Sequence, residues 1–161
     1  MANIGIVFGT NNVDSQTVAE KIAANFDSDL LNAKELTVDF LNNHEKLIFV
    51  ASTHKYGELQ QDFKAKLDVV AEADLKGKTL ALAGLGGLEK HPDTFCDGLV
   101  EFLPVIRGAK LVGAYENPGY KFENSLSLIN GKFVGFVVDI HSDNEWEQKL
   151  GSWLSSIKSE F

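Results

Sequence analysis

Short apolar runs alternate with longer segments of helical period along this chain. Strands are predicted where apolar and β-branched residues are dense, at 4–8, 28–32, 47–51, 79–83, 110–114 and 133–138. Helices are predicted where apolar residues recur every three or four positions, at 15–26, 59–70, 95–106 and 146–157, with part of 34–43 also helical. The Asn130-Gly131 pair predicts a tight hairpin turn. Strands that alternate with helices in this way indicate a parallel sheet covered on both faces, the doubly wound α/β class.

Length and composition limit the number of domains, the kinds of binding partner and the cellular location that we expect. With 161 residues, the chain can build one sizeable core, and we expect residues 1–161 to form a single domain. The 15 basic and 23 acidic residues give a net charge of −8, which argues against nucleic acid and anionic membranes and favours basic protein partners. The single cysteine, Cys96, cannot form an internal disulfide and reads as a small packed residue. No apolar run approaches the about 18 residues of a membrane span, and the first residues lack the basic start of a signal peptide, so we expect a cytoplasmic protein.

In a doubly wound fold, ligands bind at the carboxyl ends of the strands, and three loops follow strong strands there. The loop at 10–15 leads into a helix N-terminus, where free N–H groups and the helix dipole favour an anion. Hydrogen-bond donors on this loop are the side chains of Thr10, Asn11, Asn12 and Ser15. The alternative is that Asp14 or Ser15 only caps the helix. The loop matches neither the Walker A nor the G-x-G-x-x-G pattern.

The loops at 53–58 and 84–91 supply side chains for a planar ligand. His54, Tyr56 and His91 are able to stack on such a ligand, and Lys55 is able to pair with an anionic one. The competing interpretation of each histidine is an ordinary solvent-exposed loop residue. Zinc is not expected, because no third ligand accompanies the two histidines.

Several segments together resemble the flavodoxin family, in its long-chain form, over nearly the whole chain. The matching segments lie at 4–10, 18–22, 57–63, 84–86, 95–97, 118–125 and 131–135. The segments at 118–125 and 131–135 fall in the insertion that distinguishes long-chain members. The resemblance implies a flavodoxin-like three-layer sandwich with a five-stranded parallel sheet of order 2-1-3-4-5, which is the order described for flavodoxins.

The resemblance also implies a function: a low-potential electron carrier that depends on FMN and shuttles electrons between a reductase and acceptor proteins. The FMN phosphate would lie on the loop at 10–15 and the flavin ring between the other two loops. The implied cofactor-binding residues are Thr10, Asn11, Asn12, Val13, Asp14, Ser15, Thr53, His54, Lys55, Tyr56, Gly57, Leu85, Gly86, Gly87 and His91. A monomer is expected, with an acidic face that meets basic redox partners and is formed by Glu58, Asp62, Asp68 and Glu72.

The departures from the family pattern fall on the flavin contacts. Val13 stands where glycine is usual, and a β-branched residue with a positive φ would be strained there by on the order of 1–3 kcal/mol. Asp14 brings a carboxylate close to the phosphate site. His54 and His91 replace the usual Trp and Tyr, and Gly87 replaces an Asp. The changes at Val13 and Asp14 predict weaker FMN binding. Lys55 and a protonated His54 or His91 would stabilise anionic reduced flavin, so a less negative reduction potential is expected.

Two other functions remain open from the sequence. A flavodoxin-fold chain that has lost FMN would act as a binding or regulatory module and would be colourless. A flavin enzyme, such as a quinone or nitro reductase, would turn over a nicotinamide cofactor without a partner protein. A phosphorylated receiver domain is disfavoured, because the third strand runs into Ser52-Thr53 with no aspartate.

Overall fold

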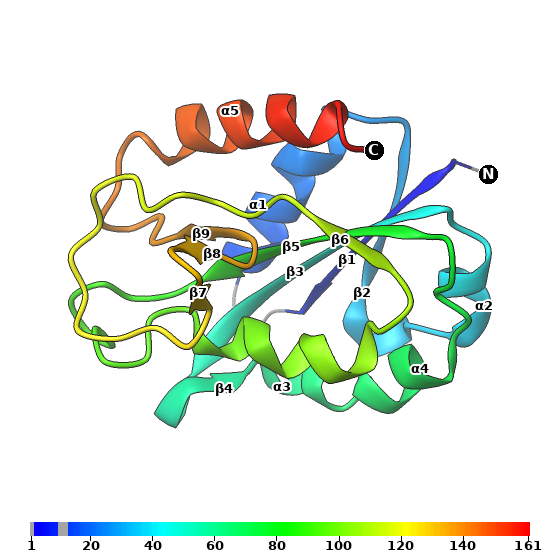
Figure 1. Ribbon diagram of the computed structural model, residues 1–161, viewed down its shortest axis with the longest axis horizontal. Helices are drawn as coiled ribbons and strands as arrows, with labels where there is room; N and C mark the ends of the chain where they lie inside the picture. The colour runs from blue at the N-terminus through cyan, green and yellow to red at the C-terminus, as the bar shows by residue number, and fades with distance from the viewer. Residues whose placement is uncertain (1, 10–12) are drawn as a thin grey trace.

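The sheet follows the predicted order. The computed structural model describes residues 2–9 and 13–161. Parallel strands lie in the order β2-β1-β3-β5-β6, with bounds Ser28–Asn32, Ile4–Gly9, Lys46–His54, Thr79–Leu85 and Lys110–Val112 (Figure 1). Strand β9 (Phe136–Val138) also pairs with β5, beyond the end of β6. The fifth strand is therefore built from two pieces, which confirms the order 2-1-3-4-5.

Helices cover both faces of the sheet and make a three-layer sandwich (Figure 1). One face is covered by α1 (Asp14–Ala23) and α5 (Trp146–Lys158). The other is covered by α2 (Val38–Asn42), α3 (Gln61–Lys64), α4 (Leu67–Glu72) and the 3₁₀ helix η3 (Asp97–Val105), with a further 3₁₀ turn, η1 (Ala33–Glu35). Two apolar clusters separate the layers, one on each side of the sheet. The rings of Phe49, Phe63 and Phe102 pack together in one of them, with centroids 4.7–5.4 Å apart.

The predicted helix over 59–70 is wrong. The 3₁₀ turn η2 (Lys55–Gly57) is followed by a short strand, β4 (Glu58–Leu59), which pairs antiparallel with the end of β3. The side chain of Gln60 then accepts a hydrogen bond from the backbone N–H of Phe63 and caps α3 at its start. A residue of non-helical backbone, Lys66, with φ −108°, separates α3 from α4.

The predicted strand over 133–138 is also divided. Its first part belongs to a hairpin between β7 (Leu128–Ile129) and β8 (Lys132–Phe133), which confirms the turn at Asn130-Gly131, with φ values of 55° and 85°. Gly135 lies directly against the backbone carbonyl of Leu82, leaving no room for a Cβ. This close approach brings the chain back to the sheet as β9.

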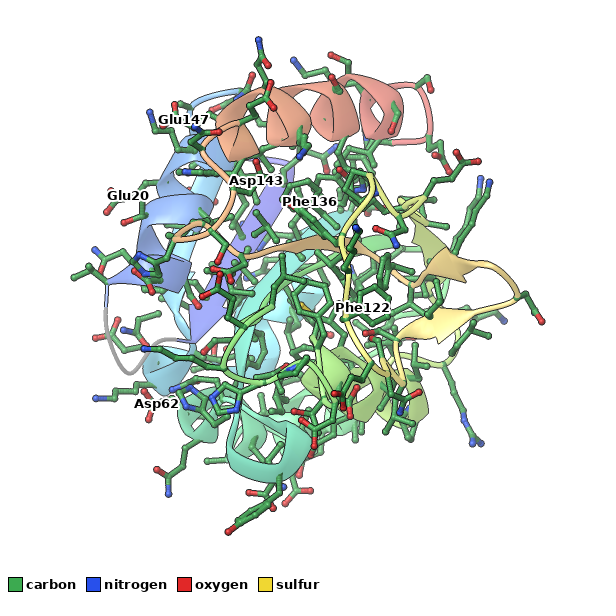
Figure 2. All side chains as sticks on the ribbon, turned by 90° about the vertical axis from the view of Figure 1, so that its left-hand side faces the viewer. Glu20, Asp62, Phe122, Phe136, Asp143 and Glu147 are labelled. Carbon is green, nitrogen blue, oxygen red and sulfur yellow. The ribbon has the colours of Figure 1, made fainter. Side chains whose placement is uncertain are left out.

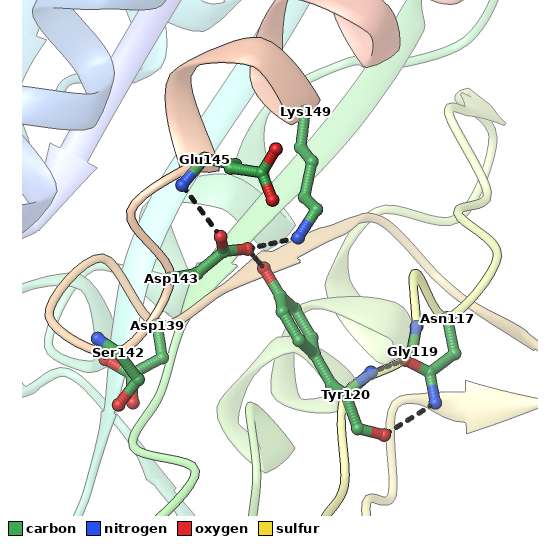
Figure 3. A network of polar contacts seen from close by, with 8 residues as sticks. All are labelled: Asn117, Gly119, Tyr120, Asp139, Ser142, Asp143, Glu145 and Lys149. Atoms are coloured by element: carbon green, nitrogen blue, oxygen red, sulfur yellow. Dashed lines mark hydrogen bonds and ion pairs between the residues drawn. The ribbon is translucent and has the colours of Figure 1, made fainter.

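The long insertion at 113–135 is tied to α5 by a buried carboxylate (Figure 3). Asp143 is 9 % exposed; its Oδ2 accepts the Tyr120 hydroxyl and the Lys149 ammonium, each at 2.6 Å. Its Oδ1 accepts the backbone N–H of Glu145 at 2.9 Å. These bonds to Lys149 and Tyr120 hold the pKa of Asp143 below its ordinary value, although burial opposes them. The segment between β9 and α5 is thereby held in place at the carboxyl end of the sheet.

Candidate functional site

A cavity of about 480 Å³ lies at the carboxyl ends of β3, β5 and β9. Figure 2 looks onto this end of the molecule. The cavity falls within the range of small-molecule and cofactor sites. It is lined by Asp14, Ser52, Thr53, His54, Leu85, Gly86, Gly87, Glu89, Lys90, His91, Asp139, His141 and Ser142. Four segments that are far apart in the sequence therefore meet here, as the doubly wound topology requires.

The start of α1 presents an acid to the cavity. Val13 is the N-cap of α1, with φ −83° and ψ −5°, so the positive φ that would strain it is absent and that expectation is wrong. Val13, as the N-cap residue, makes no side-chain capping hydrogen bond. The Asp14 carboxylate meets the imidazole of His141, with Oδ2 and Nε2 2.8 Å apart.

Ser15 is the next residue of α1 and has an unusual environment. Its side chain is completely buried, and its Oγ has no hydrogen-bond partner within residues 2–9 and 13–161. A buried hydroxyl without a partner costs about 1–3 kcal/mol, and native proteins rarely retain one without a reason. An anion at the start of α1 would give this hydroxyl an acceptor.

The second loop contributes His54, whose ring is turned towards the protein. Its Nε2 lies 2.9 Å from the Ser52 Oγ, and both residues line the cavity. Burial, and then the charge of His91, lower the pKa of His54 below its ordinary value. His54 and His91 both line the cavity, so their rings are available to an aromatic ligand there.

The third loop is positioned by an acid from the far end of the chain. The backbone N–H of Leu88 donates to Asp139 Oδ2 at 2.9 Å. The other oxygen, Oδ1, accepts the backbone N–H groups of His141 and Ser142 at 3.1 and 3.3 Å. Asp139 directly follows β9, so it joins the loop after β5 to the loop after the fifth strand.

Other predicted residues lie outside the lining of the cavity. Tyr56 is 94 % exposed and has φ 60°, so its ring does not line the cavity as the stacking prediction required. Gly57 has φ 80°, and a Cβ there would meet the Asp97 carboxylate, so its role is to let the second loop pack against η3. Val13 and Ser15 adjoin the lining without being part of it. Thr10, Asn11 and Asn12 lie outside the described residues, as does the side chain of Lys55.

Sequence reasoning missed six lining residues: Ser52, Glu89, Lys90, Asp139, His141 and Ser142. A usable signal existed for the last three, because they follow the β-forming run that ends at Val138 and so stand at a strand's carboxyl end. Cys96, by contrast, is buried as a packed residue as expected, and burial raises the pKa of its thiol. In the described part of the chain, no group of three or more His, Cys, Asp or Glu is placed to hold a metal ion. No described helix is both long and apolar enough to cross a membrane.

Comparisons with known proteins agree with this geometry. A family model described as Flavodoxin matches residues 6–104. The flavodoxin of Helicobacter pylori is 32 % identical and is matched over 99 % of its length by 100 % of this chain. A flavodoxin of Nostoc is 34 % identical, with 98 % of this chain and 96 % of that protein covered. This chain belongs to the flavodoxin family.

The flavodoxin fold is shared over the full length in three dimensions. A solved structure of Fusobacterium nucleatum flavodoxin bound to flavin mononucleotide superposes with a TM-score of 0.93 at 29 % identity, covering 100 % of this chain and 99 % of the other. The family membership confirms the resemblance and the fold expected from the sequence. The cavity lies at the strand ends, and imidazole side chains are part of its lining. We therefore ask whether these residues fit a flavin.

Proposed function

We propose that this flavodoxin binds FMN in the cavity and carries electrons singly between a reductase and acceptor proteins. Bound FMN supplies a ring that takes up and releases electrons one at a time. The observation that carries the proposal is the cavity beside the start of α1, where the buried Ser15 hydroxyl has no partner among the described residues. A phosphate there would receive the Ser15 O–H and the free N–H groups of the helix.

Other residues that line the cavity would contact the flavin ring. His54 and His91 flank the space for the ring, and Gly86 and Gly87 bring backbone close to it. A Cβ on Gly86 would lie 3.0 Å from the backbone nitrogen of Cys96, so this loop is packed too closely for larger residues. Because imidazole covers less ring area than Trp or Tyr, we propose a less negative reduction potential than the family pattern gives.

The acidic face is proposed as the docking surface for a basic partner. Glu58, Asp68 and Glu72 are exposed beside the second loop and on α4. Asp62 lies on the same side, on the face of the sheet opposite Glu147 (Figure 2). Part of this charge is already matched, since Lys64 lies 3.6 Å from Glu58 and Lys34 lies 3.9 Å from Asp62. Asp68 and Glu72 therefore carry most of the steering in this proposal. The lone, reduced Cys96 suits a carrier that works in the cytoplasm.

The test reconstitutes the protein with FMN and measures electron transfer from a nicotinamide-dependent flavodoxin reductase to cytochrome c. We expect transfer to require this protein, and its rate to fall several-fold as salt rises, because exposed charges are screened. Asp68→Asn with Glu72→Gln should reduce the low-salt rate, whereas Glu160→Gln at the far end of α5 should not. Transfer that is absent in the FMN-loaded protein would contradict the carrier function. Nicotinamide oxidation without the reductase would instead indicate a flavin enzyme.

A further inference from the structure

Asp14 and His141 lie within hydrogen-bond distance of each other in the lining of the cavity. Asp14 begins α1, and His141 lies in the segment between β9 and α5, 127 residues away. The Asp14 side chain is 23 % exposed and that of His141 is 75 % exposed. His141 is held from its own backbone as well, because its N–H donates to Asp139 Oδ1 at 3.1 Å. Tertiary structure therefore brings the imidazole to the carboxylate.

The carboxylate of Asp14 presents a physical problem for a phosphate at the same helix start. A helix N-terminus attracts one anion, and an acidic side chain in the first turn already provides one. A second anion nearby is repelled unless the carboxylate is drawn aside or neutralised. The acids Glu89 and Asp139 also line the cavity, and their charges would not offset the repulsion between Asp14 and a phosphate. The His141 imidazole lies within hydrogen-bond distance of Asp14 and is placed to draw its carboxylate aside.

We infer that His141 is a positioning residue for FMN, which acts through Asp14 and not by touching the phosphate. The 2.8 Å contact between its Nε2 and the Asp14 Oδ2 holds that carboxylate aside, so that the start of α1 accepts the phosphate. This inference rests on the proposed function, since it requires FMN with its phosphate at α1.

The chain contains a matched control pair. Lys21 Nζ and Glu147 Oε2 lie 3.2 Å apart and join α1 to α5, whereas Asp14 and His141 join α1 to the segment just before α5. Neither residue lines the cavity. Figure 2 shows Glu147 at the end of α5 that lies next to α1. Loss of this pair tests whether any link between the two regions matters for the flavin.

The experiment is a double-mutant cycle read by quenching of flavin fluorescence, with FMN and with riboflavin, which lacks the phosphate. His141→Ala is expected to weaken FMN binding about tenfold, which corresponds to about 1.4 kcal/mol. In an Asp14→Asn background the same change should alter FMN binding by less than about twofold. Riboflavin binding should change by less than about twofold in every variant, since no phosphate is present to be repelled. His141→Lys, which keeps a hydrogen-bond donor at this position, should retain FMN binding, and Glu147→Gln should match the wild type.

Each other outcome has a definite meaning. Equal weakening of FMN by His141→Ala in both backgrounds would show direct contact with the phosphate and overturn the inference. Equal weakening of riboflavin would assign His141 to the shape of the cavity, which also overturns it. Because His141 is largely exposed, its variants should fold, and thermal melts of each protein verify this. Failure of the wild type to bind FMN would overturn the proposed function and this inference together, whereas an additive cycle overturns this inference alone.

Discussion

Replacing Ser15 by alanine should stabilise the protein without FMN and weaken its hold on FMN. The Ser15 side chain is fully buried, and its hydroxyl finds no partner in the described residues, 2–9 and 13–161. Its removal should raise the free energy of unfolding by about 1 kcal/mol, the low end of the cost of such a group. For a chain of this size that corresponds to a rise in Tm of about 2–4 °C.

The same substitution removes a donor that the phosphate would otherwise receive. A hydrogen bond to a charged group contributes about 1.5–3 kcal/mol, so FMN binding should weaken roughly 10- to 150-fold. Higher stability of the apoprotein together with weaker FMN binding would show that the Ser15 hydroxyl serves the ligand and not the fold. Thermal melts of the apoprotein and fluorescence titrations with FMN measure them separately.

Ser127 is the matched control for this substitution. Its side chain is equally buried, but its hydroxyl donates to the Cys96 carbonyl at 2.7 Å. Ser127→Ala should therefore lower the apoprotein Tm, because it leaves that carbonyl short of a partner, and should leave FMN affinity unchanged. If Ser15→Ala also lowers the apoprotein Tm and leaves FMN affinity unchanged, Ser15 is an ordinary structural serine and the placement of the phosphate is refuted.

Other predictions concern the hydrogen bonds of Asp143, the flavin ring contacts and stability in acid. Tyr120→Phe removes the 2.6 Å hydrogen bond to Asp143 and should lower the free energy of unfolding by about 1–2 kcal/mol in chemical denaturation. An unchanged midpoint would contradict the stabilising role of this bond. His54→Trp with His91→Tyr should tighten FMN binding several-fold and make the potential more negative by tens of millivolts in spectroelectrochemistry, at about 59 mV per tenfold; a potential that stays fixed would show that these rings do not set it. His44 lies 2.7 Å from Asp29 and lowers the pKa of that carboxyl below its ordinary value of 3.8. This stabilisation is therefore present above that value and is lost as pH falls through the lowered pKa, so Asp29→Asn should lower Tm at neutral pH and match the wild type in strong acid; an equal loss at both would contradict it.

The sheet could be predicted because its strands are marked by local patterns. The runs at 4–8, 47–51 and 79–83 are buried on both faces, and such strands are apolar along their whole length. The wrong helix at 59–70 was predicted from the same kind of apolar pattern. Leu59 and Phe63 stand four residues apart and are both buried, but a strand followed by a capped turn buries them as well as one helix would. Apolar spacing alone does not separate these cases over so short a segment.

The candidate site could be predicted in part. The loops after the first, third and fourth strands were identifiable, because the topology places strand ends together. The partners of Asp14 and Leu88 were not, since His141 and Asp139 come from the far end of the chain and only the folded insertion brings them there. The expected strain at Val13 rested on a backbone angle, and that angle depends on how α1 begins, which the sequence pattern does not specify.

The most direct test is a titration of the desalted protein with FMN, followed by the visible spectrum and flavin fluorescence. We predict stoichiometric quenching that saturates at one FMN per chain, with a flavin spectrum that survives a second desalting. A protein that stays colourless, with flavin fluorescence unquenched at excess FMN, would contradict the carrier function and leave a flavodoxin scaffold that binds some other partner.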